Sequence, residues 1–311
     1  MPNPQHQTIT PGDGLICARL LPPNRLVLPS LSFQYPLKLI SSSVPSSKCL
    51  TVFILSYGGG LVSNDKINLR VTVETSAKLC LLTQGSTKIF KLKDPEHLTE
   101  QVMSCTLESG SSLLLLPDPI QPFADSAYRQ HQTFELPSDD SASVIVLDWV
   151  SEGRSARDEH WDFESFNSKN EFFIPREDGS KRLLLRDSMI LKRESDVGDL
   201  KRRMEGFTVF ATVMIHGPMF VKLAEDILKK FENEPRIGGR NFDNKRDFKK
   251  DEDKKGGVIW TAATIRGFVL VKVSGKELEE VKIFLRDLLR TGGEENELLS
   301  EFGEGALLCL Q

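Results

Sequence analysis

Short runs in which apolar and polar residues alternate fill the first two thirds of the chain and constrain its fold most. The clearest run spans 66–74, where Ile67, Leu69, Val71 and Val73 alternate with polar side chains. Because successive side chains of a strand point to opposite faces, this run predicts a strand with one buried and one wet face. Gly, Pro, Ser and Asp separate such runs at the spacing of a mainly β fold. Similar runs predict strands at 15–21, 50–56, 78–83, 87–92, 111–116, 132–136, 143–150, 171–174 and 182–191.

The last third adds a few α-helices to this pattern. A strand-like run at 206–216 precedes Gly217 and Pro218, and an apolar stripe of helical spacing then runs from Phe220 to Phe231. Residues 258–273 return to β character, and 276–290 predict a second amphipathic helix that Gly292 and Gly293 end. A short acidic helix is expected at 294–302. We therefore expect a β-rich body at 14–205 and a strand–helix–strand–helix region at 206–303.

Residues 232–257 form a polar, Gly-containing insertion of mixed charge. The segment offers too little apolar surface to order itself, which predicts flexibility. It is either a docking segment for a partner or a solvated loop, and the composition favours the loop.

Composition excludes several functional classes. The formal net charge is only −4, so no global field attracts nucleic acid or an acidic membrane, and no run of about 18 apolar residues could cross a bilayer. The first residues lack the basic and apolar regions of a secretory signal, so we expect a cytoplasmic protein. Five widely spaced cysteines, mostly in apolar surroundings, indicate buried free thiols.

No catalytic or metal-binding motif stands out. The glycines of 56–66 lack the spacing of a phosphate-binding loop, and a strand pattern follows them instead of a helix. The five histidines form no H-x-H or H-x-x-x-H pair and no C-x-x-C accompanies them, so the metal ligands stay unassigned. His160 could join Glu159 in a metal site, although a surface histidine is the simpler interpretation. A β-rich glycoside hydrolase that uses Asp148 and Glu159 remains an alternative.

Four short segments combine Gly, Pro and polar residues in an unusual way. The first is S-Y-G-G-G-L at 56–61, which contains Gly58, Gly59 and Gly60 and is followed by Asp65. The second is T-Q-G-S-T-K-I-F at 83–90, with Thr83, Gln84 and Lys88, and the third is L-P-D-P-I at 116–120, with Pro117, followed by P-F at 122–123 and Y-R-Q at 128–130. The fourth is G-R at 153–154, which contains Arg154 and precedes Glu159 and Trp161.

In this order the four segments resemble the signature blocks of the UreD family of urease accessory proteins, also called UreH. The family blocks read S-P-G-G-G-L-x-x-G-D, T-Q-[GS]-x-T-K-[VI]-[YF], L-P-x-P-x-x-P-F and G-R…G-E-x-[WF], and a later R-D element fits 186–187. Two departures stand in the first block: Tyr57 replaces Pro, and Ser63 and Asn64 replace a Gly-rich pair. Asn tolerates the left-handed conformation, so the turn can survive.

The resemblance implies one UreD-like domain over 1–311, built as a two-layer, helix-like stack of strands. It implies a non-enzymatic scaffold that binds apo-urease and acts with UreF and the GTPase UreG in nickel insertion. Such a protein binds no cofactor tightly and contacts nickel transiently, because nickel must be delivered rather than scavenged against tighter-binding metals. Family members have been proposed to contain an internal water-filled passage. Among the residues of the matching blocks, Asp65, Lys88 and Glu159 are candidates for a nickel path. The other motif residues named above are expected to be structural. A metal-independent interaction module is the remaining alternative.

Overall fold

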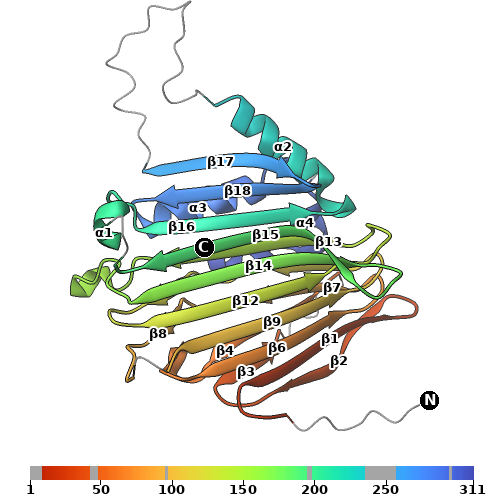
Figure 1. Cartoon of the computed structure of the whole chain (residues 1–311). Coiled ribbons are helices and arrows are strands. Elements are labelled where there is room, and N and C mark those ends of the chain that lie inside the picture. Colours follow the sequence, from red (N-terminus) through yellow and green to blue (C-terminus); the bar gives the residue numbers. More distant parts are fainter. Residues whose placement is uncertain (1–8, 43–47, 95–96, 195–197, 235–256, 294–295) are drawn as a thin grey trace, which may run out of the picture.

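A computed structural model describes residues 9–42, 48–94, 97–194, 198–234, 257–293 and 296–311. The predicted insertion at 232–257 lies outside the described residues for all but its first three positions and its last. Two sheets form the body of the molecule, and helices cover one of them (Figure 1).

The first sheet has seven strands in the order β15-β14-β12-β9-β6-β1-β2. Strands β1, β6, β9, β12 and β14 run parallel, and β2 and β15 pair antiparallel at the two edges. The strands span Asp13–Leu21 (β1), Arg25–Phe33 (β2), Lys66–Val73 (β6), Thr99–Leu107 (β9), Ala127–Glu135 (β12), Ser165–Pro175 (β14) and Lys181–Lys192 (β15).

The second sheet has eleven strands, eight of them in the order β17-β18-β16-β13-β10-β7-β4-β3. Its remaining strands, β5, β8 and β11, form a short branch beside β13. The strands span Leu37–Ser41 (β3), Leu50–Ser56 (β4), Gly60–Leu61 (β5), Lys78–Leu82 (β7), Thr87–Ile89 (β8), Ser112–Leu115 (β10), Ile120–Pro122 (β11), Ser143–Ser151 (β13), Val209–His216 (β16), Val258–Ile265 (β17) and Phe268–Gly275 (β18).

The chain builds both sheets together by crossing repeatedly from one to the other. From β6 to β14 it alternates between the sheets, so consecutive strands of one sheet are parallel and stack in sequence order. Figure 1 shows this order from β2 at the bottom to β17 at the top. The expected mainly β fold, a two-layer and helix-like stack of strands, is therefore confirmed.

The apolar periodicity of each strand reflects which of its faces are covered. In β6 the predicted residues Ile67, Leu69, Val71 and Val73 are all buried against the opposite sheet. Every residue of β13 is buried, because the first sheet covers one of its faces and the helices cover the other. The position of a strand in the stack thus decides whether its sequence alternates between apolar and polar residues or is apolar throughout.

Helices pack on the outer face of the second sheet. They are α2 (Val221–Glu232), α3 (Leu278–Leu289), α4 (Glu297–Phe302) and the terminal 3₁₀ segment Glu304–Leu310, and a one-turn helix α1 (Leu200–Arg203) precedes β16. The buried residues Ile227, Val281 and Leu285 belong to the core between sheet and helices. In the described part of the chain, no helix is both long and apolar enough to cross a membrane.

Candidate functional site

The branch β5-β8-β11 brings the sequence motifs together. Gly60 pairs with Lys88 of β8, and Lys88 pairs with Gln121 of β11, all in parallel. Gln121 Nε2 donates to the carbonyl of Gly153 at 3.0 Å, which ties the fourth motif to the third. Segments that lie up to about a hundred residues apart thus form one corner of the sandwich.

The three glycines of the first motif serve two different purposes. Gly58 and Gly59 have φ of 75° and 72°, the left-handed region that favours glycine. Gly60 has extended backbone, but a Cβ there would lie 2.5 Å from the Lys88 carbonyl oxygen. The first two therefore make the turn, and the third permits the β5–β8 pairing.

The second and third motifs interlock through Asp118. Its carboxylate accepts hydrogen bonds from Thr83 Oγ1 at 3.0 Å and from the Gly85 backbone at 2.8 Å. The Pro117 carbonyl accepts from Trp149 Nε1 at 2.8 Å. Thr83 and Pro117 thus have structural contacts, while Gln84 lies exposed between β7 and β8.

An ion pair between Arg154 and Glu159 connects the fourth motif to the end of the third. Glu159 accepts from Arg154 Nε at 2.8 Å, from Arg154 Nη2, and from the Ala124 backbone at 3.1 Å. The Arg154 guanidinium also lies over the Phe123 ring at 3.9 Å. Arg154 holds the pKa of Glu159 below its ordinary value. These contacts make the pair a clamp between the third and fourth motifs.

The other two candidates for a nickel path, Asp65 and Lys88, take no part in this ion pair. Asp65 Oδ2 accepts from the Val62 backbone at 2.8 Å and so caps the turn in which Asn64 has the expected left-handed φ of 72°. Lys88 is exposed on β8. The structure gives Asp65 and Glu159 structural contacts, and the role of all three residues towards nickel stays a prediction.

Four histidines lie in the described part of the chain, and each has an acidic neighbour. His160 Nδ1 contacts Glu152 at 2.8 Å and its Nε2 lies 3.4 Å from Asp158, whereas Glu159 turns to Arg154. The hydrogen bond with Glu152 raises the pKa of His160. Within the described ranges, no three His, Cys, Asp or Glu side chains are grouped so as to hold a metal ion.

The five cysteines are free thiols, as expected. Cys49, Cys80, Cys105 and Cys309 are buried, while Cys17 is half-buried beside Glu74. Burial raises the pKa of the Cys309 thiol to about 12, so it is protonated at neutral pH.

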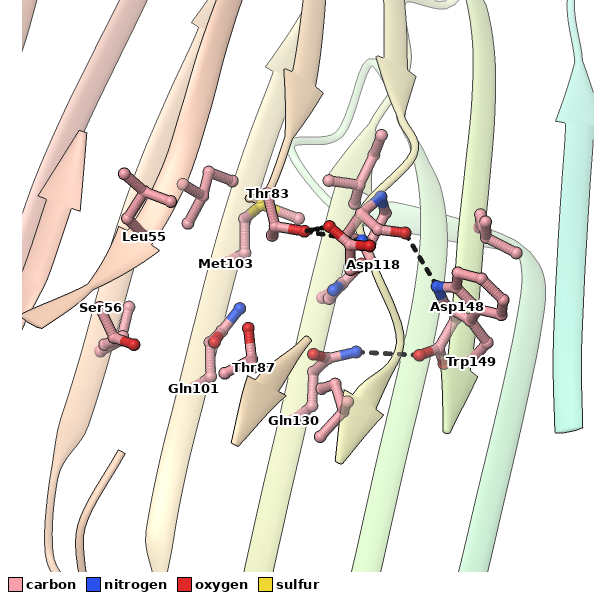
Figure 2. Close-up of a pocket in the computed structure, with 17 residues that line it drawn as sticks. Leu55, Ser56, Thr83, Thr87, Gln101, Met103, Asp118, Gln130, Asp148 and Trp149 are labelled. Atoms are coloured by element: carbon pink, nitrogen blue, oxygen red, sulfur yellow. Dashed lines mark hydrogen bonds between the residues drawn. The ribbon is translucent and has the colours of Figure 1, made fainter. Parts of the chain in front are cut away.

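A small cavity of about 40 Å³ lies between the two sheets. Its lining is mixed: Leu115 and Leu147 are apolar, whereas Gln132 of β12 adds an amide. Gln101 of β9 and Gln130 of β12 bring two more amides to the cavity (Figure 2). A water needs about 10–15 Å³ of such volume, so the space suits about three waters. Polar side chains in the middle of a β sandwich are unusual, because burial disfavours them unless they find partners.

Asp148 is the centre of the polar interior. Gln130 Nε2 donates to its Oδ1 at 3.1 Å, while Ser168 Oγ and Asn170 Nδ2 donate to its Oδ2 at 2.5 and 2.6 Å. Its side chain is only 4% exposed. Burial raises the pKa of Asp148, the three hydrogen bonds oppose that shift, and the nearby charge of Asp187 adds to it.

The network extends to both sides of Asp148. Tyr128 Oη donates to Gln130 Oε1 at 3.1 Å and points towards Gln101 at 3.4 Å. On the other side, Asp187 accepts from Lys272 Nζ at 2.6 Å, and Lys272 is exposed. Polar groups therefore lead from the cavity to the surface across several strands.

Three buried oxygens in this region have no hydrogen-bond donor among the described residues. They are Oε1 of Gln132, which lines the cavity, Oδ1 of Asn170, whose amide nitrogen binds Asp148, and Oγ1 of Thr212, which is the cross-strand neighbour of Asp148. Nearly all buried polar groups in proteins are satisfied, so such orphans indicate water or an ion. Together with the Asp148 carboxylate they form an oxygen-rich set that suits water and weakly held cations.

Sequence reasoning singled out Asp148 as half of a hydrolase pair and missed the rest of this network. A signal exists in two strands, because Tyr128, Gln130, Gln132 and Phe134 share one face of β12. Similarly, β14 places Ser168 and Asn170 between Phe166 and Phe172. Polar residues at the inward-facing positions of two neighbouring strands predict a polar interior.

The structure does not assemble the proposed hydrolase pair. Asp148 is enclosed between the sheets, where a polysaccharide has no access, and Glu159 is bound to Arg154 at the motif corner. The two carboxylates share no hydrogen-bond partner among the described residues.

Comparison with known proteins gives one consistent result. The model of the family described as UreD urease accessory protein matches residues 18–300, which is most of the chain. Three relatives illustrate the match. An uncharacterised urease accessory protein ureD-like of Schizosaccharomyces pombe is 34% identical and covers 82% of this chain and 86% of its own. Urease accessory protein 4 of Cryptococcus neoformans is 32% identical, covering 83% and 84%. Urease accessory protein UreD of an Anaeromyxobacter species is 30% identical, covering 82% and 76%.

Proposed function

Since the chain belongs to the UreD family of urease accessory proteins, we propose that it is a non-enzymatic scaffold for urease maturation. In this role it binds apo-urease and, with UreF and the GTPase UreG, supports the insertion of nickel. Its place of action is the cytoplasm. Nickel is cargo in this proposal, and the chain holds no cofactor tightly.

The observation that carries the nickel part of the proposal is the set of unpartnered buried oxygens around Asp148. Oxygens without donors attract a cation or the hydrogens of water, and the Asp148 carboxylate lies among them. Gln132 places one such oxygen at the cavity between the sheets. The cavity has room for about three waters, so it serves as a station for an ion that has lost part of its hydration shell, and not as an open channel.

Oxygen ligands suit a protein that must release its cargo. Divalent nickel binds imidazole and thiolate more strongly than amide or hydroxyl oxygen, so a cage of His and Cys would retain it. Asp148, Gln132 and Asn170 offer oxygen only. A weak site of this kind lets the ion move on to a stronger site in urease.

Replacing Gln132 by Leu tests this proposal. The substitution removes the unpartnered oxygen and keeps the side-chain volume similar, so the fold should be unchanged or slightly more stable. We expect the Gln132→Leu chain, coexpressed with urease, UreF and UreG, to form the same complex while urease receives less nickel. A pull-down and a metal determination on the same urease preparation measure both quantities.

Asn167→Leu is the matched control, because Asn167 carries its amide on the opposite, outward face of the neighbouring strand β14. It should leave nickel loading normal. Normal nickel content with Gln132→Leu would contradict the interior route and leave a metal-independent scaffold. Failure of the unmodified chain to co-purify with urease components would contradict the scaffold itself.

A further inference from the structure

The two sheets of the sandwich do not end at the same place. The first sheet ends at β15, while the second continues through β18 to β17 (Figure 1). Lys272 of β18 reaches Asp187 of β15 at 2.6 Å, which places β18 opposite β15. Strand β17 therefore lies one strand further out than β15. In the described part of the chain, the first sheet has no strand beyond β15 that could face it.

This offset leaves a row of side chains on β17 uncovered. Ile265 pairs with Phe268 and Ala263 with Leu270, and both partners belong to the core between the sheets. The row Ile259, Thr261, Ala263 and Ile265 therefore faces the same side as that core, yet Ile259 is 46% and Ile265 40% exposed. A strand added beside β15 would cover this uncharged row.

The backbone of β15 is prepared for such an added strand. The Arg193 N–H donates to the Glu164 carbonyl, just before the start of β14, at 3.1 Å. In an antiparallel pair, every second residue directs its N–H and C=O to the partner strand and the residues between direct theirs away from it. The N–H and C=O groups of Arg186, Ser188 and Ile190 consequently point away from β14. We find no partner for these outward groups among the described residues.

Among the residues that the structure describes, side chains bond to the backbone of the same edge only near its two ends. Arg266 donates to the Leu184 carbonyl at 3.5 Å, and Arg203 donates to the Lys192 carbonyl at 3.0 Å. No other described residue bonds to the outward backbone groups of the stretch between them, and that stretch contains no proline. By contrast, the opposite edge strand β2 carries Pro29, which removes a donor and blunts that edge.

Charge around the open edge is positive on balance. Strands β15, β17 and β18 with their connecting turn carry six Lys and Arg residues and a single acid, Asp187, in a chain whose net charge is −4. Glu135 and Glu171 of the neighbouring strands pair with two of the six, and Glu171 also contacts His131 and Lys169. The edge therefore favours an acidic ligand.

We propose that the open edge of β15 and the uncovered row of β17 together bind an extended acidic segment of another protein as an additional strand of the first sheet. Alternate side chains of that segment are apolar and pack on Ile259, Ala263 and Ile265. Its intervening side chains are acidic and lie near Arg186 and Lys192. This mode of recognition takes affinity from main-chain hydrogen bonds and specificity from alternate side chains.

Charge excludes two other occupants. Residues 235–256 of this chain contain eight Lys and Arg against five Asp and Glu, so that segment shares the positive sign of the edge. A second copy would bring the same cationic β15 against itself. The regular apolar row and the unpaired backbone groups favour a peptide strand over nucleic acid, which would use the positive charge alone.

Binding of a synthetic peptide tests the proposal. The probe is a fluorescent peptide of about seven residues that alternates Val and Glu, long enough to span the open stretch. We expect binding by fluorescence anisotropy, together with slowed hydrogen exchange at the amides of Arg186, Ser188 and Ile190. Slowed exchange at alternate residues distinguishes strand addition from charge attraction.

Ser188→Pro should weaken binding about tenfold or more, because it removes the central outward N–H while the ladder to β14 keeps its bonds. Ser188→Thr, which retains the N–H, is the matched control and should bind like the original chain. Ala263→Glu provides an independent variant on the other sheet: it opposes the acidic peptide and should also weaken binding, whereas Ala263→Ser should not.

Three results would overturn the proposal. One is unchanged affinity in both Ser188→Pro and Ala263→Glu. Another is equal binding of a peptide with the same composition but without the alternation. The third is equal binding of single-stranded oligo-dT, which would show that positive charge alone attracts ligands to this edge.

Discussion

At the scale of single residues, the structure shows how the motif side chains support the backbone. Asp65 caps a turn, Asp118 joins two loops, and Glu159 binds both Arg154 and a backbone N–H. Sequence reasoning found these residues because each belongs to a compact motif. Their partners could not be predicted, since Thr83 and Asp118 or Ala124 and Glu159 lie 35 positions apart.

Glu159→Gln should destabilise the protein at neutral pH by about 1–2 kcal/mol, because a charge-assisted, partly buried pair is replaced by neutral hydrogen bonds. Arg154 lowers the pKa of Glu159 in the folded state, so the pair stabilises the fold above the ordinary glutamate pKa of 4.5. That contribution is lost as pH falls through the folded-state pKa. Thermal unfolding of both proteins between pH 3 and 7 measures the effect, and a difference that stays constant over that range would contradict this account.

At the scale of elements, a strand could be predicted where it shows either clear alternation or a continuous apolar run. Strand β6 and helices α2 and α3 are recognised from their periodicity, and β4 from its continuous apolar run. By contrast, β2, β3 and β9 were not predicted. Pro29 interrupts β2, β3 has only five residues, and Gln101 in β9 faces inward among apolar neighbours. The pairing of strands could not be read from any of these patterns.

Gly60→Ala and Gly58→Ala should separate packing from backbone strain within the first motif. At Gly60 a Cβ would meet the Lys88 carbonyl oxygen at 2.5 Å, so the β5–β8 pairing must open, at a cost of about 3 kcal/mol. At Gly58 no atom of another described residue lies within 4 Å of an added Cβ, apart from the chain neighbours, so the positive φ is what opposes alanine, at about 1 kcal/mol. Chemical denaturation measures both values. Equal losses would show that the close approach to β8 is unimportant.

At the scale of the whole molecule, the sandwich buries a polar network that no single segment specifies. Asp148 meets Gln130, Ser168 and Asn170 only because three strands of the stack, β12, β13 and β14, place them at one level. The sequence shows that each of these polar residues lies at an inward-facing position of its strand. It does not show how the strands align, and this alignment brings the residues into contact. A mainly β fold could therefore be predicted, whereas its polar centre required the assembled sheets.

Asp148→Asn should change how stability depends on pH. Burial raises the pKa of Asp148, so the folded protein binds a proton that the unfolded chain releases once pH exceeds the ordinary carboxyl value of 3.8. Stability due to this group is therefore complete at low pH and falls as pH rises towards the folded-state pKa.

The asparagine side chain of this variant would carry no charge at any pH, so the variant should gain stability relative to the original chain as pH increases. The charges that act on the site are those of Asp187 and its partner Lys272, and Asp187→Asn serves as the control that removes the neighbouring charge. Urea denaturation at pH 4, 6 and 8 gives the comparison. A free-energy difference that does not change with pH would mean that Asp148 remains ionised in the folded protein, with water or a cation compensating its charge.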